Sequence, residues 1–118
     1  MNHQFGKRKL NVNSSHRKAL LRNQIIHLIK FGFLQSTRAR VKEVQSLAEK
    51  MITIARKGYD FNTIRRLNRE LPYDANAVVK LIKVIAPKYI NRPGGYTRVI
   101  PLGKRVSDTA TIARLEFV

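Results

Sequence analysis

The chain of 118 residues contains no cysteine. This absence excludes disulfide frameworks, thiol catalysis and thiolate metal sites. No segment approaches the roughly 20 apolar residues of a membrane-spanning helix, because residues 25–34, an apolar run, are interrupted by His27, Lys30 and Gly32. The N-terminal residues are polar and basic, without the apolar segment of a secretory signal. We therefore expect one folded domain that needs neither disulfides nor a membrane.

Acidic residues are scarce and unevenly placed. The chain has 7 Asp and Glu against 24 Lys and Arg, for a net charge of +17 and an isoelectric point near 11.2. Residues 1–42 contain no acid, and neither do residues 75–107. Such a charge opposes compaction unless a polyanion neutralises it. An isoelectric point this far above about 9 is typical of nucleic-acid-binding domains, so both windows predict surfaces that meet phosphate.

The hydrophobic spacing predicts helices first and strands last. Residues 1–13 show no sustained period and are expected to form a basic arm, followed by a single domain over residues 14–118. Ser14 or Ser15 is expected to cap a first helix that ends near Gly32. Further helices are predicted over residues 38–57, after Asp60 to Pro72, and after Asp74 to Pro87.

Three stretches are typical of strands. Residues 33–37 are a weak candidate, whereas residues 97–102 and 111–118 are rich in Thr, Val and Ile. The segment between the last two carries Lys104 and Arg105, so a hairpin with a basic loop is expected. Helices followed by a strand pair indicate an α+β fold.

Residues 91–98, NRPGGYTR, place two glycines beside a tyrosine. Glycine permits positive φ and leaves the peptide N–H groups unshielded, so these amides could approach phosphate closely. We expect Gly94→Val to disturb the loop because valine resists positive φ. Tyr96 could offer a ring on which a base or an arginine stacks. The stretch is equally consistent with an ordinary Gly-Gly turn beside a half-buried tyrosine.

Four stretches together carry a family resemblance. NSSHRKAL, STRARVKE, RPGGYTR and an R-x-x-D-x-A pattern before the final strand occur in this order, and over essentially its whole length the chain resembles the bacterial large-subunit ribosomal protein family numbered seventeen. The resemblance implies an rRNA-binding structural protein near the peptide exit region, beside neighbouring ribosomal proteins. It also implies about four helices in two layers on a small three-stranded mixed sheet, with residues 33–37 as the third strand.

Candidate rRNA contacts fall into groups along the chain. The arm and first helix would supply the phosphate-neutralising residues Lys7, Arg8, Lys9, Arg17, Lys18 and Arg22. Polar side chains beside them could bond phosphate or 2′-hydroxyl groups: Asn13, Ser14, Ser15, His16 and Asn23. The later contacts would be Arg38, Arg40, Lys42, Arg92, Gly94, Gly95, Tyr96, Thr97, Arg98, Lys104 and Arg105. Arg65, Arg66 and Arg69 could equally face rRNA or pair with Glu70 in solvent.

Two other functional classes fit the sequence less well. An enzyme is disfavoured because no acid precedes Glu43, no His–carboxylate spacing suits a metal, and no phosphate-binding loop or nucleophile elbow is present; no cofactor or metal is expected. A small architectural DNA-binding protein would be equally basic, but no helix-turn-helix or zipper pattern is visible. The family pattern begins almost at Met1, which favours a bacterial cytoplasm, with an organelle-encoded protein as the alternative.

Overall fold

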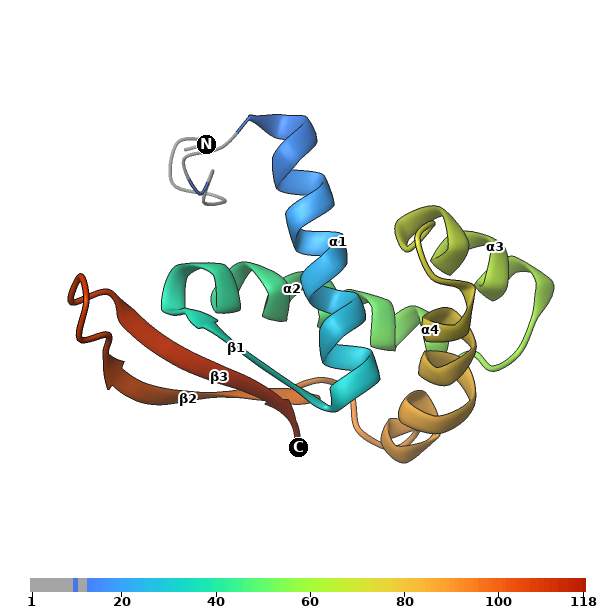
Figure 1. Cartoon of the computed structure of the whole chain (residues 1–118). Coiled ribbons are helices and arrows are strands. Elements are labelled where there is room, and N and C mark those ends of the chain that lie inside the picture. The colour runs from blue at the N-terminus through green and yellow to red at the C-terminus, as the bar shows by residue number, and fades with distance from the viewer. Residues whose placement is uncertain (1–9, 11–12) are drawn as a thin grey trace, which may run out of the picture.

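The computed structural model describes Leu10 and residues 13–118, and shows helices followed by a terminal hairpin (Figure 1). Helix α1 spans Ser14–Phe31, strand β1 Phe33–Thr37, and helix α2 Arg38–Ala55. Helices α3, Phe61–Glu70, and α4, Ala75–Lys80, follow, and α4 continues through a π-helical segment, Leu81–Ile85, and a 3-10 segment, Ala86–Tyr89. Strands β2, Thr97–Lys104, and β3, Thr111–Phe117, complete an α+β fold, as predicted.

The sheet has the order β1-β3-β2, and both pairings are antiparallel. Phe33 lies opposite Glu116, and Thr97 lies opposite Phe117. The expectation of a mixed sheet is therefore wrong. The short β2–β3 connection forces an antiparallel pair, and β1 joins the free edge of β3 rather than the edge of β2. Strands β1 and β2 thus run in the same direction without being neighbours.

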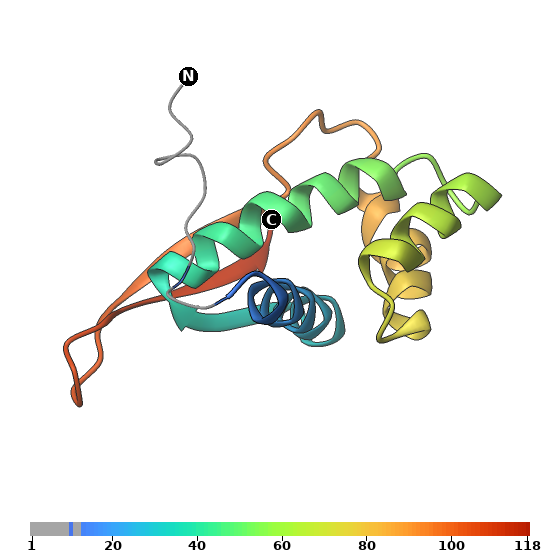
Figure 2. The same ribbon diagram turned by 90° about the horizontal axis from the view of Figure 1, so that it is seen from above.

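Helix α2 organises the helices around the sheet. It packs against all three strands, and α1 crosses it and also contacts β1 (Figure 1). The interface between helices and sheet contains Leu28, Val41, Val44 and Leu115, none of which exposes measurable surface. At 18 residues, α2 is about 27 Å long. Its C-terminal half extends past the sheet and carries α3 and the α4 segment (Figure 2).

Of the three predicted N-cap residues Thr37, Asp60 and Asp74, only Asp74 makes a side-chain cap hydrogen bond. The Asp74 carboxylate caps α4 by accepting from the amides of Asn76 and Ala77, at 2.9 and 3.2 Å. Thr37 and Asp60 occupy N-cap positions without a side-chain cap bond. Pro87 does not end the helical segment as predicted, because it lies in the first turn of the 3-10 segment, where its restricted φ is compatible with helical backbone.

Candidate nucleic-acid interface

The first turn of α1 gathers exposed polar and basic side chains without any acid. Asn13, rather than Ser14 or Ser15, is the N-cap, because its Oδ1 accepts from the His16 amide at 2.8 Å. Both serine side chains are exposed and have no part in the cap. His16, Lys18 and Asn23 are also exposed, whereas Arg17 and Arg22 are half-buried. The predicted contacts Lys7, Arg8 and Lys9, with most of the proposed arm over residues 1–13, lie outside the described residues.

An open groove of about 580 Å³ lies between α2 and the loop before β2. Its lining residues are Lys42, Gln45, Ser46, Glu49, Lys50, Thr53, Gly94, Gly95, Tyr96 and Thr97. The groove brings Lys42, from the first acid-free window, close to the two glycines of the second. Arg38 and Arg40 lie in the preceding turn of α2, Arg38 exposed and Arg40 half-buried.

Lys50 and Ser46 line this groove but were not among the predicted contacts. They follow Lys42 at intervals of four residues, so they share its side of α2. That spacing could have revealed them. Lys50 lies in the mixed-sign stretch of residues 43–74, outside the acid-free windows from which the contacts were predicted.

The Tyr96 side chain is buried beneath the loop, since only 1% of its surface is exposed. Arg56 Nη1 donates to the Tyr96 hydroxyl at 2.8 Å, and Arg56 Nη2 donates to the Ile90 carbonyl at 2.8 Å. The Arg56 guanidinium carbon lies 5.9 Å from the centre of the tyrosine ring. The expectation that a base could stack on Tyr96 is therefore wrong, because the ring is buried and its arginine partner comes from α2.

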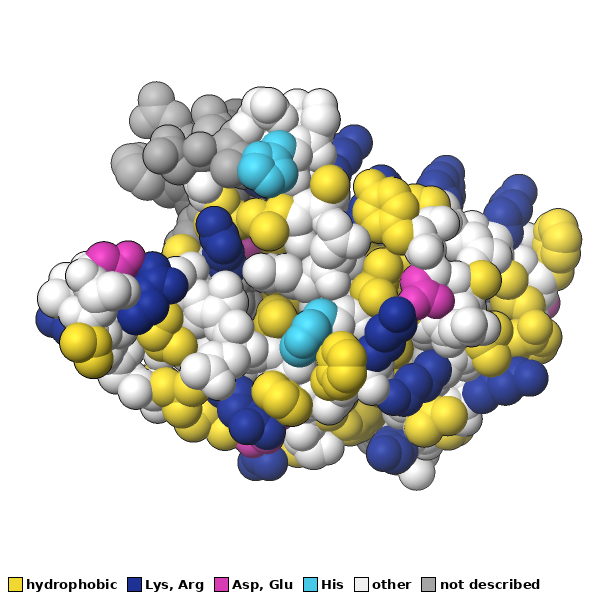
Figure 3. Space-filling model, in the orientation of Figure 1, with side chains coloured by type: hydrophobic (Ala, Val, Ile, Leu, Met, Phe, Trp, Pro, Cys, Tyr) yellow, Lys and Arg dark blue, Asp and Glu magenta, His cyan; other side chains and the backbone are white. Residues whose placement is uncertain are grey.

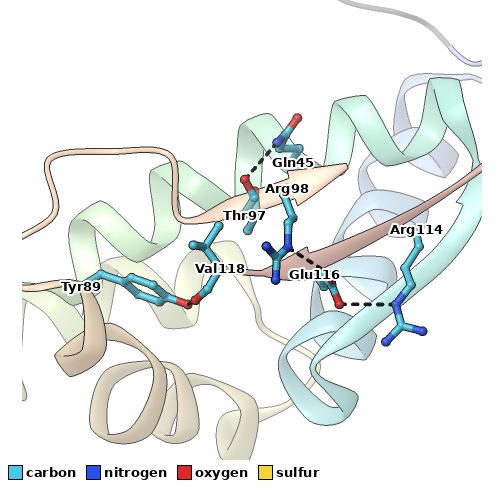
Figure 4. A network of polar contacts seen from close by, with 7 residues as sticks. All are labelled: Gln45, Tyr89, Thr97, Arg98, Arg114, Glu116 and Val118. Carbon is cyan, nitrogen blue, oxygen red and sulfur yellow. Dashed lines mark hydrogen bonds and ion pairs between the residues drawn. The ribbon is translucent and has the colours of Figure 1, made fainter. Parts of the chain in front are cut away.

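Thr97 and Gly94 also differ from their expected roles. Thr97 is buried, its hydroxyl donates to Glu49 Oε2 at 2.8 Å, and its carbonyl accepts from Gln45 Nε2 at 3.5 Å, a bond drawn in Figure 4. The Thr97 side chain is therefore not free for RNA. Positive φ occurs at Gly95, at +63°, and not at Gly94, so the conformational argument made for Gly94 applies to its neighbour. Arg92 is exposed and donates to the Gly94 carbonyl at 3.2 Å.

Two of the predicted arginines are neutralised within the chain. Arg98 Nε lies 3.1 Å from Glu116, which also contacts Arg114 at 3.6 Å (Figure 4). In the hairpin loop, Arg105 holds Asp108 at 2.6 and 2.8 Å. The Arg105 hydrogen bonds, followed by that of the Ala110 amide, lower the pKa of the Asp108 carboxyl to about 2. Lys104, also exposed, has no such partner within the described residues.

Within the described part of the chain, no group of three His, Asp or Glu side chains is arranged to hold a metal ion. Nor does any helix there have the length and apolar character needed to cross a membrane. The arrangement is that of a basic surface beside two residues without side chains, Gly94 and Gly95, which is suited to contact with phosphate.

The amino-acid sequence of the chain is similar to those of a known protein family. Residues 20–118 match the sequence model of the family described as ribosomal protein L17. The Campylobacter lari protein named large ribosomal subunit protein bL17 is 46% identical over 118 residues, covering 100% of this chain and 99% of its own. Proteins of the same name are 43% identical in Desulforudis audaxviator, over 97% of this chain and 100% of theirs, and 45% identical in Helicobacter acinonychis, over 100% of both. The chain belongs to the ribosomal protein L17 family.

Proposed function

We propose that the chain is a structural component of the large ribosomal subunit that binds large-subunit rRNA through its phosphate backbone. The family is one of structural ribosomal proteins and not of enzymes, which confirms the expectation of no enzymatic activity. Its relatives are proteins of bacterial ribosomes, so the chain works in the ribosome of a bacterial cytoplasm, beside rRNA and other ribosomal proteins. A position near the peptide exit region is part of the proposal and rests on the family resemblance.

The groove between α2 and the loop at Gly94 and Gly95 is the observation that carries rRNA binding. Lys42 and Lys50 line it together with Gly94 and Gly95, which have no side chain to shield their peptide N–H groups. Lysine ammonium groups neutralise phosphate and release its counterions, while the amides hydrogen-bond the phosphate oxygens. This proposal also includes the predicted contacts on α1, from Ser14 to Asn23. The remaining contacts lie outside α1 and are Arg38, Arg40, Arg92 and Lys104. Arg98 and Arg105 contribute less, because Glu116 and Asp108 already neutralise them.

Matched lysine variants test the groove. Lys50 and Lys57 are both exposed lysines, one lining the groove and the other just beyond α2. Binding of the full chain to protein-free large-subunit rRNA is measured across a range of salt concentrations. Lys50→Gln is expected to reduce the log–log salt slope by roughly 0.7–0.9, the loss of one phosphate contact. Lys57→Gln is expected to leave the slope unchanged, and equal slopes for the two variants would overturn the groove assignment.

Sedimentation tests the assignment to the subunit itself. In a lysate gradient with a high-salt wash and magnesium low enough to separate the subunits, the protein is expected to migrate with the large subunit. The DNA-binding alternative makes a different prediction, namely migration with the nucleoid and binding to duplex DNA as tightly as to rRNA. That pair of results would contradict the proposal.

A further inference from the structure

Helix α3 presents a face of arginines that the proposed interface does not use. Asn62, Arg65, Arg66 and Arg69 follow the spacing i, i+3, i+4, i+7, so they share one side of the helix. The other side is anchored by Leu67, which has no exposed surface. All three arginines are exposed to solvent. Packing of the helix therefore holds three guanidinium groups outward on one surface.

These arginines have no neutralising partner in the described part of the chain. Arg65, Arg66 and Arg69 make no ion pair or side-chain hydrogen bond there, and Glu70 does not pair with them. Arg98, Arg105 and Arg114, in contrast, each face a carboxylate. Like charges three and four residues apart destabilise a helix, so this face carries a cost that an external anion would remove.

The chemistry of the surface favours RNA over an acidic protein. Guanidinium groups bind phosphate oxygens through paired hydrogen bonds. Exposed aromatic rings adjoin both ends of α3: Tyr59, before the helix, is 59% exposed, Phe61, its first residue, is 76% exposed, and Tyr73, after it, is 54% exposed. Lys83 lies 4.5 Å from the centre of the Tyr59 ring and Arg22 lies 6.0 Å from that of Tyr73, so among the described contacts Phe61 is the ring of the three without a cation on it. Unstacked bases pack on such rings, and arginines with aromatics are the recurring combination in proteins that bind single-stranded nucleic acid.

The arginine face adjoins the proposed contact Arg22, whose Nη2 donates to the Arg69 carbonyl at 3.5 Å, but it is distant from the contacts at the start of α2 and on the hairpin. The first turn of α2 and the β2–β3 hairpin lie at one end of the molecule, and α3 lies at the other (Figures 1 and 2). The longest dimension of the chain is 44 Å. In Figure 3, Lys and Arg side chains project along the upper right edge, over α3. An RNA segment at α3 would therefore differ from the one at the start of α2.

We propose that the α3 face formed by Arg65, Arg66 and Arg69 is a second RNA-binding surface, which takes the phosphate backbone of an unpaired or looped rRNA segment. The protein then joins two rRNA segments at its opposite ends. This inference rests on the proposed rRNA-binding function and extends it.

The cysteine-free chain allows a local test within assembled large subunits. A cysteine introduced by Asn62→Cys carries a tethered iron chelate at the arginine face, and Ala39→Cys carries one at the first turn of α2. Both positions are exposed. Hydroxyl radicals from the Asn62 position are expected to cut rRNA nucleotides that the Ala39 position does not cut. The unmodified chain, treated identically, controls for cleavage by free iron.

The other possible cleavage patterns distinguish a failure of the α3 surface from a failure of the proposed rRNA-binding function. Cuts from Ala39 without cuts from Asn62 would overturn the second surface and leave the proposed function standing. Identical cuts from both positions would overturn the joining of two segments. Cleavage of a neighbouring protein alone from Asn62 would identify a protein partner and overturn the RNA assignment. An absence of rRNA cuts from both positions would overturn the proposed function as well.

A binding measurement tests the charge argument independently. The full chain with Arg65→Gln, Arg66→Gln and Arg69→Gln is expected to show a log–log salt slope for large-subunit rRNA reduced by roughly 2 to 3. Glutamine keeps the helix propensity of arginine, and circular dichroism checks that α3 remains folded. The corresponding lysine substitutions preserve charge and are expected to retain the slope. An unchanged slope in the glutamine variant would overturn the inference.

Discussion

At the scale of single residues, Tyr96 joins three parts of the chain. Its hydroxyl accepts from Arg56 at 2.8 Å and lies 3.2 Å from the Thr53 hydroxyl, and its ring lies 5.4 Å from that of Tyr89. Arg56 in turn reaches the carbonyl of Ile90. The shape of the groove therefore depends on a buried hydroxyl that binds a charged partner.

Tyr96→Phe keeps the aromatic ring and removes the hydroxyl that accepts the hydrogen bond from Arg56. Hydrogen bonds to charged groups contribute about 1.5–3 kcal/mol, and Arg56 can recover part of that from water because it is only half-buried. We expect the free energy of unfolding, measured by urea denaturation, to fall by about 1–2 kcal/mol. Tyr89→Phe, which removes the single hydrogen bond from Tyr89 to the main-chain oxygen of Val118, is the control and should cost less than the loss of both contacts of the Tyr96 hydroxyl. A greater cost for Tyr89→Phe would contradict this account.

The sequence alone could not predict the role of Tyr96. A tyrosine beside two glycines is compatible with a surface ring or a buried one, and the decision depends on Arg56, 40 residues earlier. The cap of α1 was missed for a related reason. Asn13, Ser14 and Ser15 are all good N-cap residues, and only the position at which the backbone becomes helical selects among them.

At the scale of elements, the loop between the 3-10 segment and β2 owes its shape to one of its two glycines. A side chain at Gly94 or Gly95 would meet nothing within 4 Å, but only Gly95 has positive φ, at +63°. The left-handed region costs other residues roughly 1–2 kcal/mol. The backbone conformation, and not the space around the Cα atom, therefore requires glycine at position 95 but not at position 94.

Gly95→Ala is expected to lower the free energy of unfolding by about 1–2 kcal/mol and to weaken rRNA binding at the groove. Gly94→Ala adds the same methyl group without the backbone penalty and is expected to have little effect on stability. Thermal or urea denaturation of the two variants provides the measurement. Equal destabilisation would show that crowding, and not positive φ, governs this loop.

The elements themselves were largely predictable because their hydrophobic periods are strong. Val41, Val44, Ala48, Met51 and Ala55 alternate steps of three and four, and all are buried on α2. The terminal strands and the weak strand over residues 33–37 also form as predicted. Strand order was not accessible from local patterns, since β1 pairs with β3 near the other end of the chain, with Phe33 opposite Glu116.

At the scale of the whole molecule, charge is the dominant constraint. A net charge of +17 works against the compact state through self-repulsion. The described ion pairs neutralise few of these cations, and those at Arg98 and Arg105 are exposed pairs of small energetic value. The free protein is therefore less stable than its buried core alone would make it.

Raising the salt concentration from about 0.05 M to about 0.5 M is expected to stabilise the free protein, because it shortens the distance over which the charges repel. The measurement is thermal unfolding followed by circular dichroism, in which a gain of 1 kcal/mol corresponds to roughly 4 °C or more. A melting temperature that falls with salt would mean that attractive ion pairs outweigh the repulsion.

Composition predicted the polyanion partner, but the contacts that we propose are not confined to the acid-free windows. Those windows are residues 1–42 and 75–107, and the proposed contacts Lys50 and the α3 arginines lie between them. Whether Arg66 pairs with Glu70 is a matter of side-chain geometry, which the order of residues leaves open. The predicted contacts of the N-terminal arm lie outside the described residues, and the predicted rRNA interface as a whole stays a prediction.

The π-helical segment determines which way Ile85 points. Two buried rows repeat every four residues through this region: Ala77, Leu81 and Ile85 in one, and Val78, Ile82 and Ala86 in the other. In a uniform α-helix, each step of four would rotate a row by about 40°, and two steps would turn Ile85 about 80° away from the side that Ala77 occupies. A π turn closes over more residues and reverses that rotation. The phase of the helix is thus reset midway, so Ile85 still points into the core.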